Sequence, residues 1–169
     1  RTRPAWGEVE ASLRSQALGI MADAPVYLVH MNVAGEVDQL KYTRERGMPM
    51  MGETCPQYLF FTDASLERED GSKWICSPPM RKAEDGKRLY GGLADGTIQV
   101  LATDHCPFFY DGRKPILYEG KEIAIPGKEL GIGDFTEIPN GLPGVGDRLP
   151  VFWTKGVGSG KITPEEFVR

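Results

Sequence analysis

The stretch that decides the fold is IQVLATDHCPF, residues 98–108. Its first five residues, Ile98 to Ala102, form a largely apolar run that is typical of a strand buried in a sheet. The run ends in Thr103, Asp104 and His105. A carboxylate beside an imidazole at the end of a buried strand is costly to desolvate without a partner. We therefore expect Asp104 to have a partner elsewhere in the fold.

Two other apolar runs precede this stretch, PVYLVH at residues 25–30 and a short one at residues 48–52. They alternate with helical patterns at residues 8–22, 33–44 and 82–95. Such alternation favours parallel βαβ units. Strands that are apolar throughout are expected where helices cover both faces of a sheet.

The first helical pattern has an apolar stripe on one face. The stripe consists of Val9, Leu13, Ala17 and Ile20, and Glu10 can pair with Arg14 four residues later on the same helix. We expect this stripe to mark one face of the helix.

The second half of the chain is mostly loop, with many of the 21 glycines and 13 prolines between residues 107 and 160 and one helix expected near residues 149–157. Thr163, Pro164 and Glu166 form a capping box that announces a helix, yet the sequence ends three residues later at Arg169. Three parallel strands cannot close an eight-stranded barrel, which needs about 250 residues. We therefore expect these 169 residues to be part of a longer chain.

Composition narrows the function classes. A net charge of −4 argues against a nucleic-acid or anionic-membrane partner, and no apolar run approaches the roughly 20 residues that span a bilayer. Three cysteines without a CxxC spacing argue against a disulfide framework. They favour a reducing, cytoplasmic setting.

His30 and Asp104 are the strongest candidates for chemistry, because each ends an apolar strand. In a (β/α) barrel the active site lies at that end of the strands. Imidazole and carboxylate are both zinc ligands, but a catalytic zinc needs at least three protein ligands and the sequence offers two. The plainer interpretation is that each is a polar residue satisfied by a neighbouring loop.

The remaining polar candidates favour structural roles. His105 points to the opposite face from Asp104, and Cys55 and Cys76 are interpreted as small buried hydrophobes. Ser77 has no nearby base to activate it as a nucleophile. Pro78 and Pro79 instead make it a candidate for rigid backbone hydrogen bonds to a ligand.

Several segments resemble the dihydropyrimidinase and D-hydantoinase family of cyclic amidohydrolases. They are PVYLVH, GETCPQYLFFT, CSPPMR, ATDHCPFF, GKELGIGDFTEIPNGLPGVGDRLP and TKGVGSGKIT, in this order along the chain. The resemblance implies an α/β fold, a partial TIM-type (β/α)8 barrel of the metal-dependent amidohydrolase superfamily. Residues 1–169 would be the C-terminal part of that barrel domain, without its N-terminal half and the flanking β-sandwich.

The resemblance also implies roles for four residues. His30 would bind one of two zinc ions, and Asp104 would be both a metal ligand and the general base and acid. Ser77 and Asn140 would hold the ring of the substrate through backbone groups. The other metal ligands and a tyrosine that stabilises the oxyanion would precede residue 1. The reaction would be hydrolysis of the cyclic amide bond in dihydropyrimidines or hydantoins, which yields N-carbamoyl amino acids.

Two alternatives stay open at this point. Dihydropyrimidinase-related scaffold proteins share the fold but lack the metal ligands, whereas this chain has both His30 and Asp104. Allantoinases and dihydroorotases are also cyclic amidases, but GDFTEIPNG is not expected in them. The complete enzyme would form a homo-oligomer, a tetramer, and we expect the 169 residues alone to be inactive.

Overall fold

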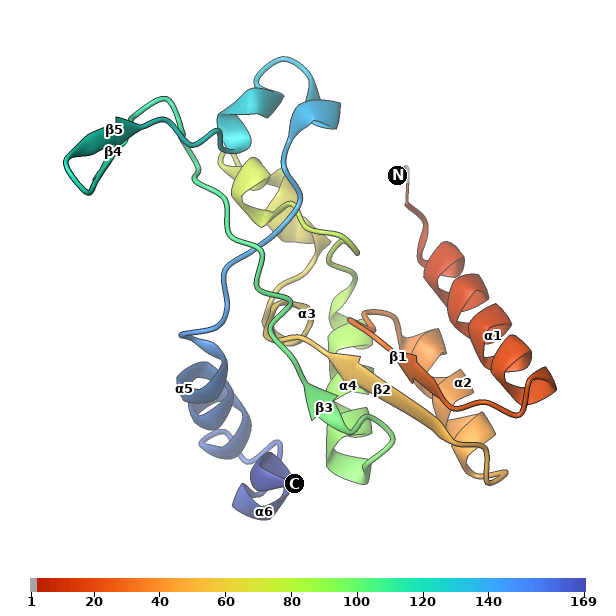
Figure 1. Cartoon of the computed structure of the whole chain (residues 1–169). Helices are drawn as coiled ribbons and strands as arrows, with labels where there is room; N and C mark the ends of the chain where they lie inside the picture. Colours follow the sequence, from red (N-terminus) through yellow and green to blue (C-terminus); the bar gives the residue numbers. More distant parts are fainter. Residues whose placement is uncertain (1–2) are drawn as a thin grey trace.

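A computed structural model describes residues 3–169. Its central feature is a three-stranded parallel sheet with the strand order β1-β2-β3 (Figure 1). The strands are β1 (Val26–Leu28), β2 (Met50–Thr54) and β3 (Val100–Leu101). Val26 pairs with Met50, and Glu53 pairs with Val100. The expected parallel βαβ arrangement is confirmed, although β2 begins two residues later than the pattern predicted.

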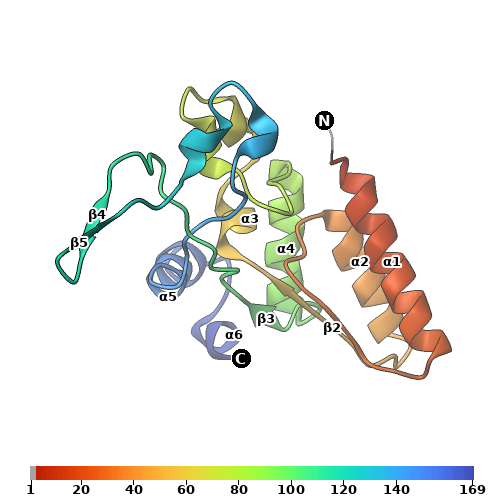
Figure 2. The same ribbon diagram turned by 45° about the horizontal axis from the view of Figure 1, so that its top comes forward.

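Helices connect the strands and cover one face of the sheet (Figures 1 and 2). Helix α2 contacts both α1 and α4. The longer helices are α1 (Ala5–Met21), α2 (Ala34–Arg44) and α4 (Ala83–Asp95), and the short ones are α3 (Pro56–Phe60), α5 (Arg148–Phe152) and α6 (Pro164–Val168). Gly96 ends α4 in the left-handed conformation that glycine adopts without a Cβ penalty.

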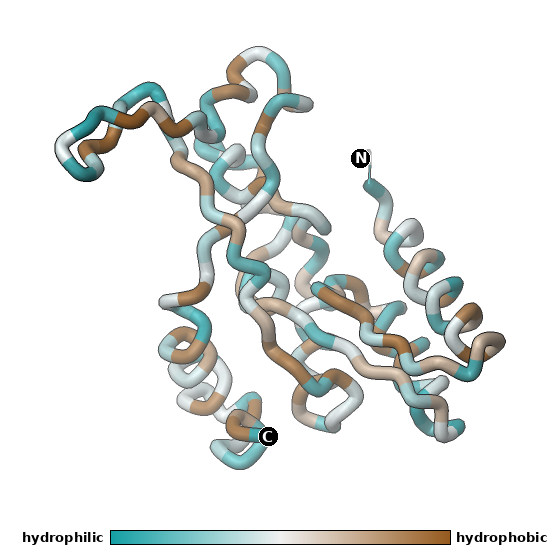
Figure 3. Tube along the Cα trace, in the orientation of Figure 1, coloured by the Kyte–Doolittle hydropathy of each residue, from teal (hydrophilic) through white to brown (hydrophobic). Residues whose placement is uncertain are grey.

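The core lies between the sheet and α2 and α4. It is rich in sulfur-containing side chains, which adapt to irregular gaps. Its fully or nearly fully buried members are Leu28, Met31, Val37, Leu40, Met50, Cys55, Tyr58, Cys76, Met80, Leu89 and Ile98. The expectation of helices on both faces of the sheet is wrong for the described residues. On the other face Tyr27, Val29 and Met51 remain partly exposed, since side chains alternate along a strand. Hydrophobic residues follow β1 and β3 in Figure 3.

The expected apolar stripe of α1 is not the face that packs. Val9 is buried, but Leu13 and Ile20 are exposed, and the other buried positions are Ser12, Gln16 and Gly19. Gln16 accepts a hydrogen bond from the Thr43 hydroxyl at 2.6 Å, in the next helix. A Cβ on Gly19 would overlap the Val26 side chain, so glycine allows α1 to approach β1 closely. The Gln16–Thr43 hydrogen bond and the absence of a side chain at Gly19 therefore define the packed face.

The stretch 107–160 holds more structure than its glycines and prolines indicated. Strands β4 (Ile116–Tyr118) and β5 (Lys121–Ile123) form an antiparallel hairpin that projects from the body (Figure 2). Its two turn residues, Glu119 and Gly120, have φ of 49° and 76°. Two consecutive positive φ values are typical of a type I′ turn, which usually shows an Asn-Gly or Asp-Gly pair. Glu-Gly is a weaker signal, and the hairpin was missed.

Three local features that the sequence predicted are present, two in the C-terminal region and one in α1. Helix α5 continues into a π-helical turn at Trp153–Val157, close to the expected helix at residues 149–157. Thr163 and Glu166 form the predicted capping box, with reciprocal hydrogen bonds of 2.7 and 3.1 Å. Glu10 pairs with Arg14 at 2.8 Å, as predicted. Within residues 3–169, no helix combines the length and apolarity that crossing a bilayer requires.

Replacing Leu40 by alanine tests the position of the core. Leu40 is fully buried between α2 and the sheet, so the substitution should lower the free energy of unfolding by about 2–5 kcal/mol. Leu117 on the hairpin is 75% exposed, and Leu117→Ala is the matched control. Urea denaturation measures both. An equal loss for the two variants would contradict the assigned core.

The cysteines give a second prediction. Cys55 and Cys76 are buried and Cys106 is exposed, and all three are free thiols. A thiol reagent such as Ellman's reagent should therefore modify Cys106 rapidly in the native protein, and Cys55 and Cys76 only after denaturation. A Cys106→Ser variant should show no rapid reaction. Rapid native labelling of that variant would contradict the burial of the other two thiols.

Candidate functional site

His30 and Asp104 lie at the same edge of the parallel sheet. His30 follows β1 and Asp104 follows β3, and the chain leaves both strands at their carboxyl ends. Because β2 lies between them, their strands are two spacings, about 10 Å, apart. Asp104 is exposed and His30 is half-buried. The structure thus places both residues on the edge where the sequence predicted them.

Both residues have a left-handed backbone, with φ of 41° at His30 and 48° at Asp104. For residues other than glycine this conformation costs on the order of 1–2 kcal/mol. Among the described residues, Asp23 and Glu119 are the other non-glycine positions with positive φ. Backbone strain of this kind gathers at functional sites, where the surrounding structure maintains it.

Hydrogen bonds from β2 hold both turns. The amide after His30, that of Met31, donates to the Glu53 carbonyl at 2.8 Å. The Ala102 amide donates to the Thr54 carbonyl at 2.9 Å, two residues before Asp104. The Thr54 hydroxyl donates to the Met31 carbonyl at 2.7 Å. The middle strand therefore fixes the path of the chain on both sides.

The buried titratable side chains near Asp104, those of Cys55, Tyr58 and Cys76, are neutral. Burial raises the pKa of Cys76 to about 11. Burial, followed by the negative charge of Asp104, also raises the pKa of the Cys55 thiol far above its usual range. The same two causes contribute to a raised pKa of Tyr58. These thiols stay protonated at neutral pH, which agrees with their interpretation as buried hydrophobes.

Ser77 and Asn140 form a second cluster. The Ser77 hydroxyl donates to the Asn140 side-chain oxygen at 3.2 Å, although 63 residues separate them. The Arg3 guanidinium donates to the same oxygen at 3.4 Å and also to the Ser77 hydroxyl. The Arg3 carbonyl accepts from Arg81 at 2.7 Å. The structure therefore brings together the two residues expected to bind substrate, and adds Arg3.

The carbonyl of Ile75 ties the same two loops together through the backbone. It accepts from the Gly141 amide at 3.1 Å and from the Lys128 ammonium at 2.7 Å. Ile75 lies two residues before Ser77, and Gly141 directly follows Asn140. A backbone hydrogen bond therefore joins the two loops next to Ser77 and Asn140.

His105 fastens the loop beyond Asn140. Its Nδ1 accepts from the amides of Gly144 and Val145 at 3.0 and 3.2 Å. The Cys106 amide donates to the Leu142 carbonyl at 3.0 Å. These contacts agree with the structural role expected for His105.

His30 and Asp104 supply two donors of the types that zinc prefers. Within residues 3–169 no group of three or more His, Cys, Asp and Glu side chains is close enough to hold a metal ion. A metal at this edge would therefore need ligands besides these two.

Sequence reasoning missed Arg3 and Lys128 as parts of the site. Arg3 had one signal, since Arg3-Pro4 resembles the end of a family motif. Lys128 had none: a lysine in a loop is ordinarily solvated, whereas this one is 4% exposed.

Comparison with models of known protein families gave no match. Comparison with curated proteins gave a clear one: the chain is 40% identical to D-phenylhydantoinase of Escherichia coli (strain K12 / DH10B) over 169 residues. The match covers 99% of this chain and 34% of the relative.

Solved structures give the same result. A dihydropyrimidinase from Brevibacillus agri NCHU1002 matches 99% of this chain and 34% of its own, with 40% identity and a TM-score of 0.88. A D-hydantoinase from Bacillus sp. AR9 matches the same shares with 38% identity and a TM-score of 0.88.

These matches confirm the expected fold, which is a set of βα units from an amidohydrolase barrel and not a closed barrel. The chain spans about a third of the length of the relatives it matches. Nearly the entire chain is similar to one third of a D-phenylhydantoinase, a dihydropyrimidinase and a D-hydantoinase.

Proposed function

We propose that the complete gene product carrying these residues is a metal-dependent cyclic amidohydrolase. It hydrolyses the C–N bond of dihydropyrimidines or hydantoins to N-carbamoyl amino acids, and residues 1–169 form the C-terminal part of its barrel domain. The observation that supports this most is the left-handed backbone at both His30 and Asp104 on one sheet edge. The 40% identity to a D-phenylhydantoinase supports the reaction class.

The donor set at this edge fits a zinc site. The imidazole of His30 and the carboxylate of Asp104 would hold the metal, and the family resemblance suggests two zinc ions in the complete protein. When bound, zinc lowers the pKa of water toward 7 and polarises a carbonyl oxygen. This is the chemistry that amide hydrolysis needs at neutral pH.

Asp104 moves the proton in this proposal. A carboxylate oxygen takes a proton from the attacking water and later gives it to the ring nitrogen that leaves. Such positioned proton transfer contributes about 10²–10⁴-fold to a rate. Asp104 is suited to it because its side chain is exposed at the edge, whereas the thiols beneath it are buried and neutral.

Ser77 and Asn140 orient the ring. Their backbone groups can accept from and donate to the ureide end of a cyclic substrate, which carries both a carbonyl and an N–H. The Ile75 carbonyl and the Ser77–Asn140 hydrogen bond hold these two backbones at a fixed spacing. Pre-formed positioning of this kind lowers the entropy cost of reaching the transition state.

The proposal includes a cell compartment and an assembly. Three free cysteines, two of them buried, favour a reducing cytoplasm. A homotetramer is the assembly that the family resemblance suggests.

Asp104→Asn tests the proposed proton transfer in the complete gene product. Because asparagine cannot carry the proton but tolerates the left-handed backbone, hydrolysis of dihydrouracil or hydantoin should fall by about 10²–10⁴-fold. The control is Asp23→Asn, at another exposed aspartate with a positive φ of 51°. Turnover should be unchanged there. Near-normal turnover of Asp104→Asn, with circular dichroism unchanged, would refute the role of Asp104.

His30→Asn tests the metal site. Asparagine keeps the positive φ and removes the imidazole, so the purified protein should bind at least one zinc ion roughly tenfold more weakly or more. Inductively coupled plasma mass spectrometry after dialysis against a chelator measures the zinc retained. The matched control His105→Asn should retain the wild-type amount. Equal metal content in all three proteins would argue against His30 as a ligand.

The same measurements separate the enzyme from the scaffold alternative. A scaffold protein of this fold would bind no zinc and hydrolyse neither ring. The presence of both His30 and Asp104 favours the enzyme.

A further inference from the structure

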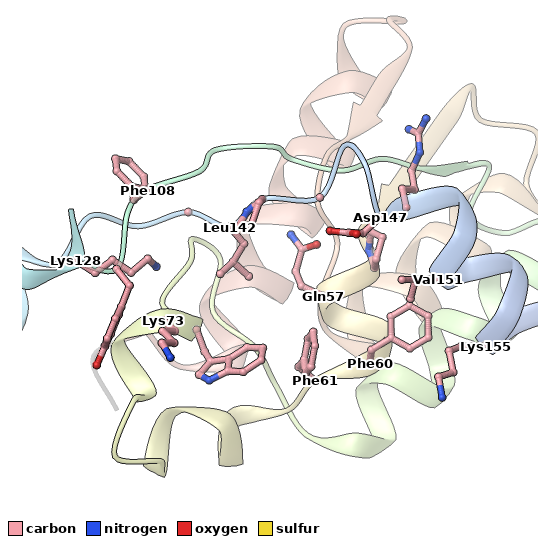
Figure 4. A pocket seen from close by; sticks show the side chains of 17 residues that line it. Gln57, Phe60, Phe61, Lys73, Phe108, Lys128, Leu142, Asp147, Val151 and Lys155 are labelled. Carbon is pink, nitrogen blue, oxygen red and sulfur yellow. The ribbon is translucent and has the colours of Figure 1, made fainter. Parts of the chain in front are cut away.

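An open pocket of about 810 Å³ adjoins the Ser77–Asn140 cluster and shares Lys128 with its network. Its walls come from α3, from the turn around Trp74, from the segment that carries Phe108 and from α5 (Figure 4). None of His30, Ser77, Asp104 and Asn140 lines it. Its volume falls within the range of about 300–1,000 Å³ that is usual for small-molecule sites.

Aromatic rings form most of the apolar wall. Five of them line the pocket: Phe60, Phe61, Trp74, Phe108 and Tyr110. Phe61 and Trp74 are in direct contact, with ring centroids 4.6 Å apart. Flat, apolar faces of this kind favour a ligand with an aromatic ring.

The polar part of the wall is mainly cationic. Lys73, Lys128, Arg148 and Lys155 line the pocket with one carboxylate, Asp147. Lys73 is paired with Asp70 at 3.2 Å, and Arg148 donates to the Leu101 carbonyl at 3.3 Å. Figure 4 shows Lys73 and Lys128 toward one end of the pocket and Lys155 toward the other.

Lys128 is the unusual member of this set. The residue is buried, with an exposed fraction of 4%. The ammonium has three N–H groups, and the acceptor it meets is the Ile75 carbonyl at 2.7 Å. Among the described residues no carboxylate lies within ion-pair distance of it. Burial also lowers its pKa. A buried charge without a counter-ion is costly, and an anion at this position would offset the cost.

We propose that this pocket binds a small aromatic carboxylate. The ring packs against Phe61 and Trp74, and the carboxylate accepts a charge-assisted hydrogen bond from Lys128. The site is separate from the proposed catalytic edge and does not depend on the hydrolytic activity. The excess of cations over Asp147 favours an anion over a neutral or cationic aromatic ligand.

A matched pair of probes tests the charge preference, 2-naphthoate and its neutral counterpart 2-naphthamide. Isothermal titration calorimetry with the complete gene product should show 2-naphthoate binding at least about tenfold more tightly, as expected for a hydrogen bond between charged groups. Lys128→Met should remove this preference. Lys114→Met, at an exposed lysine outside the pocket, should retain it.

Two further variants keep the test decisive. Phe61→Ala, at a partly exposed position of the aromatic wall, should weaken both probes and leave the preference for the anion. Asp104→Asn should bind 2-naphthoate like the wild type, so that loss of hydrolysis and loss of this site are separate results. Equal binding of the two probes to the wild type would overturn the proposal, and so would a preference that survives in a folded Lys128→Met variant. If a carboxylate from another segment of the protein already pairs with Lys128, the two probes should bind the wild type equally.

Discussion

The backbone hydrogen bonds that β2 makes to its two neighbours are the constraint on which the rest of the structure depends. They set β1 and β3 parallel on either side of it and hold the chain as it turns away at the carboxyl ends. At these turns His30 and Asp104 have positive φ, a conformation that is uncommon outside glycine, although histidine and aspartate adopt it more often than most residues. The backbone cost thus falls on the two residues of this edge whose side chains are of metal-ligand type. In the proposed function, metal binding gives the reason for maintaining it.

A network of hydrogen bonds joins loops that are distant in the sequence. The Ile75 carbonyl, the Ser77 hydroxyl and the Asn140 amide connect the loop after α3 with the long segment that precedes α5. His105 fastens the far end of that segment. Loops of this length would otherwise be mobile, and their fixed spacing allows backbone groups to recognise a small ring. The buried ammonium of Lys128 belongs to both this network and the aromatic pocket, so it connects the two regions structurally.

Much of this arrangement could be predicted from the sequence, because it rests on local patterns. The apolar runs before His30 and Asp104 predict buried parallel strands, and Thr163 with Glu166 predicts a helix start that the structure contains. The family resemblance predicted that backbone groups of Ser77 and Asn140 hold the substrate ring; this stays a prediction, and the structure places the two side chains in hydrogen-bond contact.

Features that depend on tertiary contacts could not be predicted. The packed face of α1 is set by Gly19 and the Gln16–Thr43 hydrogen bond, and not by Leu13 and Ile20. The hairpin depends on a positive φ at Glu119, and a glutamate in the sequence does not indicate a positive φ. The burial of Lys128 depends on loops that meet only in the folded chain. Periodicity does not report contacts of this kind.

In the proposed function His30 and Asp104 share a metal centre. Anomalous X-ray diffraction at the zinc edge, on crystals of the complete gene product grown with zinc, tests it most directly. We expect anomalous density about 2.0–2.2 Å from a ring nitrogen of His30 and from a carboxylate oxygen of Asp104. Density at neither residue, or zinc held elsewhere while these two side chains point apart, would contradict it.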